Sequence, residues 1–145
     1  LKVVLEPGRS IAAPSGALLT RVLYRKRGGS KNFIVVDAAM NDLVRPALYG
    51  AKHPVALLGA ARGPLKKYEI VGPVCESGDF LAKGVPLPEP RNGDLLLICS
   101  AGAYGFSMSS QYNSRPRAAE ALITGASWRL VRRRETYKDL VAAEL

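Results

Sequence analysis

Residues 18–37, LLTRVLYRKRGGSKNFIVVD, carry the clearest structural signal in this chain. Apolar and polar residues alternate in part from Leu18 to Arg25, and Asn32 to Asp37 is rich in Val, Ile and Phe. Between these segments, Arg27-Gly28-Gly29-Ser30 has the composition of a turn. The pattern predicts a β-hairpin, which is the starting point for a mainly β domain.

Further short apolar segments follow, and turn residues separate them. The remaining strand candidates are His53 to Leu58, Lys67 to Val71, Leu95 to Cys99, and a last hairpin of Ala118 to Ile123 and Trp128 to Arg133. Pro86-Leu87-Pro88-Glu89-Pro90 is interpreted as a connector. A polar helix from Thr136 to Leu145 is expected to close the chain. Many short strands with turns between them are typical of a β-barrel or β-sandwich.

One short helix is predicted within the β pattern. Asn41 or Asp42 is a suitable N-cap for a helix that ends near Tyr49. Pro46 is tolerated only in the first turn of such a helix. The i, i+4 spacing then puts Arg45 and Tyr49 on the same face.

The first residues do not fit the hairpin pattern. Leu1 to Leu5 is a continuous apolar run, as expected for a strand that is covered on both faces in a parallel sheet. No parallel partner for it is predicted within the chain, so its neighbours are expected elsewhere. The chain also begins without methionine and without the layout of a signal peptide, which indicates a segment from inside a longer protein.

Length and composition limit the possible functions. The chain has 145 residues, of which 48% are hydrophobic, and this is enough for the core of one domain. No apolar run approaches the roughly 18 to 20 residues that span a bilayer, so no membrane association is expected. The two cysteines, Cys75 and Cys99, are expected to be free thiols in a reducing compartment. The single histidine, His53, and the lack of paired Cys/His spacing predict no metal site.

The net charge of +9 suggests nucleic-acid binding, and Arg132-Arg133-Arg134 is the densest basic run. The other cations are spread along the chain, few aromatic residues lie among them, and no DNA- or RNA-binding motif is present. Three arginines in a strand are more typical of a solvated edge or an ion-paired face. We therefore expect no nucleic-acid partner.

The segment Val74-Cys75-Glu76-Ser77-Gly78-Asp79-Phe80 carries the most informative chemistry. It places a thiol next to a carboxylate in a turn, where flanking strands can aim both groups at a ligand. A thiol with a reference pKa of about 8.5 is mostly protonated near neutral pH and can donate a proton. The alternative is that Cys75 is a small buried hydrophobic residue, which is the expected state of Cys99 in its apolar strand.

Three further groups of residues are candidates for binding. Glu6-Pro7-Gly8-Arg9 combines a carboxylate, a glycine and a guanidinium, or is a simple turn. Arg45 and Tyr49 either bind a carboxylate or only cover a helix surface. Ala101-Gly102-Ala103-Tyr104-Gly105 places a tyrosine between glycines, which is consistent with close packing against a ligand or with an aromatic residue at the edge of the β domain.

Together these motifs resemble the C-terminal part of bacterial diaminopimelate decarboxylases. The matching segments, in the order of that family, are Leu5 to Ser10, Asp37 to Tyr49, Val71 to Asp79, Ser100 to Phe106 and Tyr112 to Arg117. Members of this family are fold-type III pyridoxal-phosphate enzymes with an eight-stranded β/α barrel and a C-terminal β domain. The resemblance implies that residues 1–16 are the last strand and loop of the barrel, whose remainder is absent, and that residues 17–145 form the C-terminal β domain.

The resemblance also implies a role for each candidate residue. Pyridoxal 5'-phosphate draws electrons from Cα into its protonated ring, and its Schiff-base lysine is expected in the missing barrel. The implied catalytic residue is Cys75, as the acid that reprotonates Cα. The implied cofactor-binding residues are Glu6, at the ring nitrogen, and Pro7, Gly8, Arg9 and Tyr104. The implied substrate-binding residues are Arg9, Arg45 and Tyr49 for carboxylates, Glu76 for the distal ammonium, and Tyr104.

The implied reaction converts meso-2,6-diaminopimelate to L-lysine and carbon dioxide, the last step of lysine biosynthesis, in the cytoplasm. It requires a homodimer that shares its active sites across the interface, so this chain alone is expected to be inactive. An ornithine, arginine or lysine decarboxylase is one alternative, although its substrate has no distal carboxylate for Arg45 and Tyr49 to bind. A non-catalytic dimerisation or regulatory β domain is the other, and it has no need of Cys75, Glu76 or Tyr104.

Overall fold

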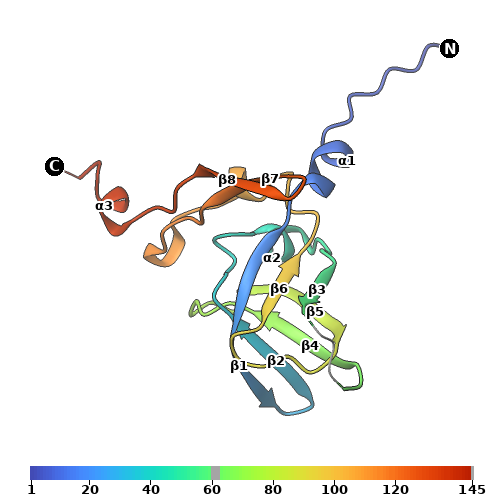
Figure 1. Cartoon of the computed structure of the whole chain (residues 1–145), viewed down its shortest axis with the longest axis vertical. Coiled ribbons are helices and arrows are strands. Elements are labelled where there is room, and N and C mark those ends of the chain that lie inside the picture. Colours follow the sequence, from blue (N-terminus) through green and yellow to red (C-terminus); the bar gives the residue numbers. More distant parts are fainter. Residues whose placement is uncertain (60–62, 145) are drawn as a thin grey trace.

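A curved six-stranded sheet forms the main part of the computed structural model, which describes residues 1–59 and 63–144 (Figure 1). The strand order is β3-β6-β1-β2-β4-β5, and only β2 and β4 are parallel. The strands are β1 (Leu18–Gly28), β2 (Lys31–Val36), β3 (Val55–Leu58), β4 (Lys66–Val71), β5 (Phe80–Leu87) and β6 (Leu95–Ile98). The two outer strands, β3 and β5, lie close to each other, so the sheet curls toward a barrel. The prediction of a mainly β domain with short helices is confirmed.

The long strand β1 joins two parts of this sheet. Leu18 to Arg21 pair with β6, and the residues from Val22 onward pair with β2. The register shifts between Val22 and Tyr24, as in a β-bulge, where the strand changes partners. The hairpin predicted for residues 18–37 is confirmed, and its turn contains Gly29, whose φ of 57° is readily adopted by glycine.

The hydrophobic core lies on the inner face of the curved sheet. Burial alternates along β4 and β6, as expected when one face of a strand is covered. The buried cluster consists of Val22, Ile34, Val36, Ala38, Leu43, Tyr68, Ile70, Leu81, Leu87, Leu96 and Ile98. The core therefore draws on five of the six strands and on the segment that follows β2.

Strand β5 is the strand that the sequence did not predict. The interpretation of residues 86–90 as a connector is wrong for Pro86 and Leu87, which belong to this strand. Lys83, Gly84 and Pro86 interrupt the apolar alternation, although Leu81 and Leu87 are buried in the core. Because β5 is an outer strand, proline can be accommodated in it without breaking a central ladder.

The predicted helix near residue 45 is α2 (Arg45–Tyr49), but its start differs from the prediction. The N-cap is Val44 and not Asn41 or Asp42. The Asp42 carboxylate instead accepts a hydrogen bond of 2.9 Å from the backbone N–H of Ala39 and closes a turn before the helix. No helix within the described ranges is long and apolar enough to cross a membrane.

A separate two-stranded hairpin follows, formed by β7 (Glu120–Thr124) and β8 (Ser127–Arg132). It lies on the side of the molecule that carries both termini, opposite the tip of the β1–β2 hairpin (Figure 1). This hairpin was predicted and is confirmed. The last helix, α3 (Tyr137–Leu140), is shorter than the predicted helix of residues 136–145, and Leu145 lies outside the described residues.

The chain begins with an extended segment and two short helices. Residues 1–7 form neither helix nor strand and extend away from the sheet (Figure 1), and Val3, Val4 and Leu5 are exposed. The helices α1 (Arg9–Ala12) and η1 (Ala13–Ser15) follow. A strand needs a hydrogen-bonded neighbour, and no described element pairs with this segment. The assignment of residues 1–16 to a barrel stays a prediction.

Candidate functional site

The guanidinium of Arg45 lies over two tyrosine rings. Its Cζ atom is 5.5 Å from the centroid of the Tyr49 ring and 5.4 Å from that of the Tyr104 ring. The helix α2 places Arg45 and Tyr49 one turn apart, as predicted, whereas Tyr104 comes from the loop after β6. Stacking on aromatic faces fixes the plane of a guanidinium. We call these three residues the arginine stack.

Arg45 is only 9% exposed. Its side chain nevertheless forms no hydrogen bond or ion pair with any residue in the described ranges, and its guanidinium lies over the two aromatic rings. A guanidinium has five N–H donors in a planar fork that matches a carboxylate or a phosphate. The arginine stack therefore presents an oriented cation whose donors are available to an anionic ligand.

The loop that carries Tyr104 is fastened to the N-terminal helices. Ala101 donates a backbone hydrogen bond of 2.8 Å to Gly16, and Gly102 donates one of 3.1 Å to Ala13. A Cβ atom on Gly102 would lie 2.3 Å from the carbonyl oxygen of Ala12. This glycine therefore makes room for another part of the backbone, and close packing of the loop against a ligand stays a prediction.

Gly105, the second glycine in this loop, is explained in the same way. A Cβ atom there would lie 2.3 Å from the carbonyl oxygen of Ala101. Tyr104 itself has a φ of 60°, in the left-handed region that residues other than glycine rarely adopt. Such backbone conformations are often found at ligand-binding sites, and here the conformation leaves the Tyr104 ring exposed.

The Glu6-Pro7-Gly8-Arg9 motif comes close to the arginine stack. A Cβ atom on Gly8 would lie 3.9 Å from the hydroxyl of Tyr104, and Gly8 is the N-cap of α1. Glu6, Pro7 and Arg9 are exposed. The motif therefore leads into a helix and is more than a simple turn. It places a carboxylate and a guanidinium on the segment that passes Tyr104.

The Cys75–Glu76 loop, residues 72–79, connects β4 to β5. Asp79 is 5% exposed, and its carboxylate accepts backbone hydrogen bonds from Met40, at 2.8 Å, and from Val74, at 2.7 Å. This buried carboxylate fixes the loop against the segment that leads to α2. Cys75 is exposed, so the alternative of a buried hydrophobic residue is wrong, and both cysteines are free thiols as predicted.

Two donors hold the carboxylate of Glu76. The backbone N–H of Gly78 donates to Oε1 at 3.1 Å, and the hydroxyl of Tyr112 donates to Oε2, also at 3.1 Å. These bonds, first that of Gly78 and then that of Tyr112, lower the pKa of Glu76. The same contact raises the pKa of Tyr112. Glu76 is therefore a carboxylate near neutral pH and can accept a hydrogen bond from an ammonium group.

The arginine stack and the Cys75–Glu76 loop are joined only indirectly. Within residues 1–59 and 63–144, no hydrogen bond or ion pair connects Arg45, Tyr49 or Tyr104 to Cys75 or Glu76. The link is the segment that precedes α2. In this segment, the Met40 backbone bonds Asp79 of the Cys75–Glu76 loop, and the backbone and side chain of Asn41 bond Ser110, which precedes Tyr112.

Asn41, Asp79 and Tyr112 are the residues whose part in this arrangement was not predicted. All three occur in the motifs that carry the family resemblance; Asp79 and Tyr112 had no assigned role, and Asn41 was expected only as a possible N-cap. The one sequence feature that could have marked them as functional is that each is a polar residue inside such a motif. The partners that give each one its function lie far away in the sequence.

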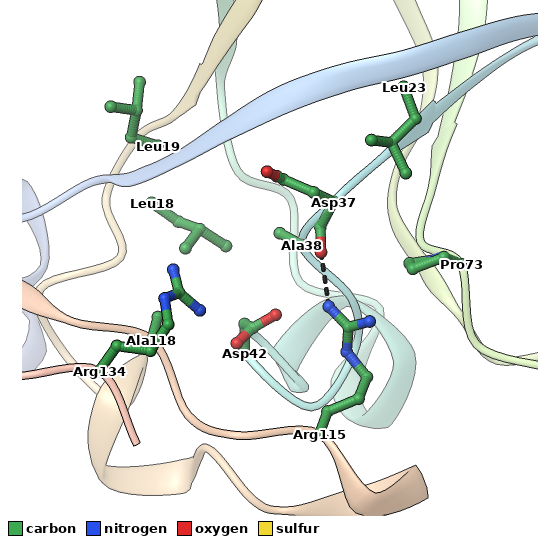
Figure 2. A pocket seen from close by; sticks show the side chains of 10 residues that line it. All are labelled: Leu18, Leu19, Leu23, Asp37, Ala38, Asp42, Pro73, Arg115, Ala118 and Arg134. Carbon is green, nitrogen blue, oxygen red and sulfur yellow. Dashed lines mark hydrogen bonds between the residues drawn. The ribbon is translucent and has the colours of Figure 1, made fainter. Parts of the chain in front are cut away.

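A hollow of about 330 Å³ lies beside the segment that follows Tyr112 (Figure 2). Arg115 reaches into it and donates hydrogen bonds to the Asp37 carbonyl, at 2.5 Å, and to Oδ1 of Asn41, at 3.0 Å. Figure 2 shows Asp42 between Arg115 and Arg134. Burial raises the pKa of Asp42. None of the predicted site residues lines this hollow, whose arginine anchors the chain behind Tyr112.

The basic run of residues 132–134 is ion-paired, as predicted, at two of its three positions. Arg132 contacts Glu120 at 2.5 Å and stacks on Phe106, with its Cζ 4.1 Å from the ring centroid. Arg133 contacts Asp139 at 2.6 Å. These contacts tie β8 to β7, to Phe106 and to α3, and they account for part of the basic run.

Comparison with known proteins identifies a family. Residues 11–102 match the family described as "Pyridoxal-dependent decarboxylase, C-terminal sheet domain". The diaminopimelate decarboxylase of Deinococcus radiodurans is 55% identical over 141 residues, which are 97% of this chain and 37% of that protein. The chain thus spans a little over a third of the length of this relative.

Solved structures give the same result. A crystal structure of a protein from Aquifex aeolicus is similar with a TM-score of 0.93 and 48% identity, covering 99% of this chain and 36% of that one. The diaminopimelate decarboxylase of Helicobacter pylori complexed with L-lysine has a TM-score of 0.87 and 47% identity, covering 94% of this chain and 34% of that one. The similarity therefore includes nearly all of the β domain.

Proposed function

Since the chain belongs to the pyridoxal-dependent decarboxylases, as their C-terminal sheet domain, we propose that it is part of an enzyme that converts meso-2,6-diaminopimelate to L-lysine and carbon dioxide. One observation carries this proposal furthest. Arg45 is nearly buried, lies over two tyrosine rings and has donors without a partner in the described chain. An amino-acid carboxylate is the kind of ligand that satisfies such a guanidinium.

The residues near Tyr104 fit one side of pyridoxal phosphate. Glu6 offers a carboxylate, Arg9 a guanidinium and Tyr104 a hydroxyl, and Gly8 brings no side chain next to that hydroxyl. When bound, this cofactor withdraws electrons from Cα of the substrate. We assign Glu6 to keep a proton on the ring nitrogen, and Pro7, Gly8, Arg9 and Tyr104 to bind the cofactor. The Schiff-base lysine is expected in the barrel domain.

The distal end of the substrate explains the choice of diaminopimelate. Its distal carbon bears both a carboxylate and an ammonium, so a selective site needs a cation and an anion together. Arg45, with the Tyr49 hydroxyl, supplies the cation, and the Glu76 carboxylate supplies the anion. Ornithine, lysine and arginine lack the distal carboxylate, and their recognition would leave Arg45 without its ligand.

Cys75 donates the proton that completes the reaction. When carbon dioxide leaves, the electron pair of the broken C–C bond remains with Cα. The thiol S–H bond breaks as the new Cα–H bond forms, and the resulting thiolate regains a proton from water. The exposure of Cys75 on its loop supports this role, because a buried thiol has no access to a substrate.

The active site is shared between two subunits in this proposal. The Cys75–Glu76 loop and the arginine stack lie on different loops without a direct polar contact, and Cys75, Glu76 and Tyr104 are all exposed. Each subunit then contributes its Cys75–Glu76 loop to the cofactor site of its partner. A homodimer is the smallest assembly in which every site is complete.

Mixing inactive variants of the full-length protein tests the shared site. Cys75→Ala is combined with a variant that lacks the cofactor lysine, and the subunits are exchanged. Random pairing should restore about a quarter of wild-type activity, because half of the dimers are mixed and each has one complete site. Activity that stays at the level of the separate variants would refute the shared site.

Turnover by the full-length wild type tests the substrate. Diaminopimelate, lysine, ornithine and arginine are compared at equal concentration, and released carbon dioxide is measured. We expect turnover of diaminopimelate alone. Preferential turnover of ornithine, lysine or arginine would identify a related decarboxylase, and release of carbon dioxide from none of the four would favour a non-catalytic domain.

A further inference from the structure

The hydroxyl of Tyr112 is the one side-chain group among the described residues that bonds the Glu76 carboxylate. It donates to Oε2, while Gly78 donates to Oε1, each at 3.1 Å. With one donor on each oxygen, the plane of the carboxylate is fixed. A carboxylate has about four acceptor positions, so each oxygen keeps capacity for a further donor.

The position of Tyr112 depends on a strained turn. Asn113 has a φ of 60° and Ser114 a φ of 54°, two successive non-glycine residues in the left-handed region. Each such residue costs on the order of 1 kcal/mol, so the conformation persists only where its surroundings hold it. Turns of this kind often aim a side chain at a functional site.

Two anchors hold this turn, one on each side. Before it, the backbone N–H of Ser110 donates to the Asn41 carbonyl at 2.9 Å. After it, Arg115 donates from Nε to Oδ1 of Asn41 at 3.0 Å, and from a terminal nitrogen to the Asp37 carbonyl (Figure 2). Asn41 is 2% exposed, so the turn is fastened to a buried residue of the β domain.

Tyr112 does not contribute to the hydrophobic core. Its side chain is 46% exposed and is absent from the buried cluster. A role in packing would place the ring inside the domain and leave the hydroxyl incidental. Here the ring is exposed and the hydroxyl bonds a carboxylate, so the polar contact is what the strained turn secures.

We propose that Tyr112 is a positioning residue for substrate selection, whose hydroxyl holds the Glu76 carboxylate in the orientation that receives the distal ammonium of the amino-acid substrate. This inference rests on the proposed function, in which Glu76 binds that ammonium. Tyr112 acts only through Glu76, so its contribution is restricted to ligands that carry a distal ammonium.

The test measures ligand binding to the full-length holoenzyme. Dissociation constants are determined by calorimetry for L-lysine and for L-norleucine, which has the same carbon chain without the distal ammonium. Tyr112→Phe removes only the hydroxyl. We expect it to weaken binding of L-lysine about five- to tenfold, less than the loss of a direct hydrogen bond to a charged group because the hydroxyl acts through Glu76, and to leave binding of L-norleucine unchanged.

The pH dependence gives a second readout. The Tyr112 bond is one of the two main causes that lower the pKa of Glu76. Removal of the hydroxyl should raise that pKa, so that the loss of L-lysine affinity on acidification begins at a higher pH in Tyr112→Phe. The matched control is Tyr137→Phe, because Tyr137 is exposed and its hydroxyl bonds no described residue.

Three outcomes separate failure of this inference from failure of the proposed function. If Glu76→Gln weakens binding of L-lysine while Tyr112→Phe matches wild type in affinity and pH dependence, the role of Tyr112 is refuted and that of Glu76 stands. If Glu76→Gln also leaves L-lysine binding unchanged, the assignment of Glu76 to the distal ammonium fails. Equal weakening of L-lysine and L-norleucine by Tyr112→Phe would likewise refute the inference, because it would indicate a general structural effect.

Discussion

The guanidinium of Arg45 lies over the ring of Tyr104, with 5.4 Å between its Cζ atom and the ring centroid. This contact joins helix α2 to the loop after β6. It also explains how a cation can be nearly buried without a counter-ion among the described residues, because the face of an aromatic ring carries negative charge density. The same contact leaves the edge of the guanidinium free for a carboxylate.

Replacement of Arg45 by lysine should separate the effect of the positive charge of Arg45 from the effect of its planar shape. Lysine keeps the positive charge but loses the planar fork and the stacking between the rings. In the full-length enzyme we expect kcat/KM for diaminopimelate to fall about ten- to a hundredfold, mainly through KM. Inhibition by L-lysine, which lacks a distal carboxylate, should change little.

Arg129→Lys is the control for this substitution, since Arg129 is exposed on β8 and its side chain pairs with no described residue. It should behave as wild type with both ligands. If Arg45→Lys weakens inhibition by L-lysine by as large a factor as it lowers kcat/KM for diaminopimelate, Arg45 does not bind the distal carboxylate.

Gly102 should not tolerate a side chain. A Cβ atom there would lie 2.3 Å from the Ala12 carbonyl oxygen and 2.7 Å from the Gly16 nitrogen, both of them backbone atoms that cannot move independently. We expect Gly102→Ala to lower the free energy of unfolding by about 2 kcal/mol or more, measured as a lower midpoint of thermal unfolding of the full-length protein.

Gly8→Ala provides a matched comparison for stability. The nearest atom to a Cβ on Gly8 is the Tyr104 hydroxyl at 3.9 Å, which is an ordinary contact. Its unfolding midpoint should stay close to that of wild type. Equal midpoints for the two alanine variants would contradict the tight contact between the loop after β6 and the N-terminal helices.

Much of the fold could be predicted from local pattern, because a hairpin with clear turn residues can be recognised from adjacent residues alone. The hairpin of residues 18–37 and the last hairpin, β7–β8, are both confirmed. Strand β5 was not predicted because Gly84 and Pro86 interrupt the alternation of its apolar residues. A strand can contain these residues when it lies at the edge of a sheet, and that position is not visible in the local sequence.

The sequence could predict which segments contribute to the candidate site, but not which residues of different segments contact each other. The stacking of Arg45 on Tyr49 follows from helical spacing within one element. The approach of Tyr104 to Arg45, the packing of Gly102 against Ala12 and the bond from Tyr112 to Glu76 join distant parts of the chain. Such contacts depend on how the sheet curves, which no local pattern specifies.

Asp79 should prove necessary for the position of Cys75. Its carboxylate uses both oxygens, one for the Met40 N–H and one for the Val74 N–H. Asp79→Asn replaces one acceptor by an NH₂ group that cannot accept either bond. We expect the full-length enzyme to lose about 2 kcal/mol of stability and at least about tenfold in kcat, because the loop no longer presents its thiol correctly.

Asp94→Asn controls for the loss of a carboxylate that caps a loop. Asp94 accepts a hydrogen bond of 2.7 Å from the Arg91 N–H, in a loop that carries none of the proposed site residues. It should lose some stability but keep kcat. A wild-type kcat in Asp79→Asn would show that the Cys75–Glu76 loop does not depend on this anchor.

Glu135 should make stability depend on pH in the acidic range. Its carboxylate accepts hydrogen bonds from the Arg117 side chain, the Arg117 backbone and Gln111, and these lower its pKa to about 2. A carboxylate with a lower pKa in the folded state stabilises the protein above its ordinary pKa of about 4.3. This stabilisation is lost as the pH falls toward 2.

Glu135→Gln should therefore lower the unfolding midpoint at pH 7, and its difference from wild type should shrink from pH 5 to pH 3. Glu144→Gln, at an exposed position without a described side-chain partner, should match wild type throughout. A difference between Glu135→Gln and wild type that stays constant from pH 7 to pH 3 would mean that the Glu135–Arg117 pair contributes no ionisation-linked stability.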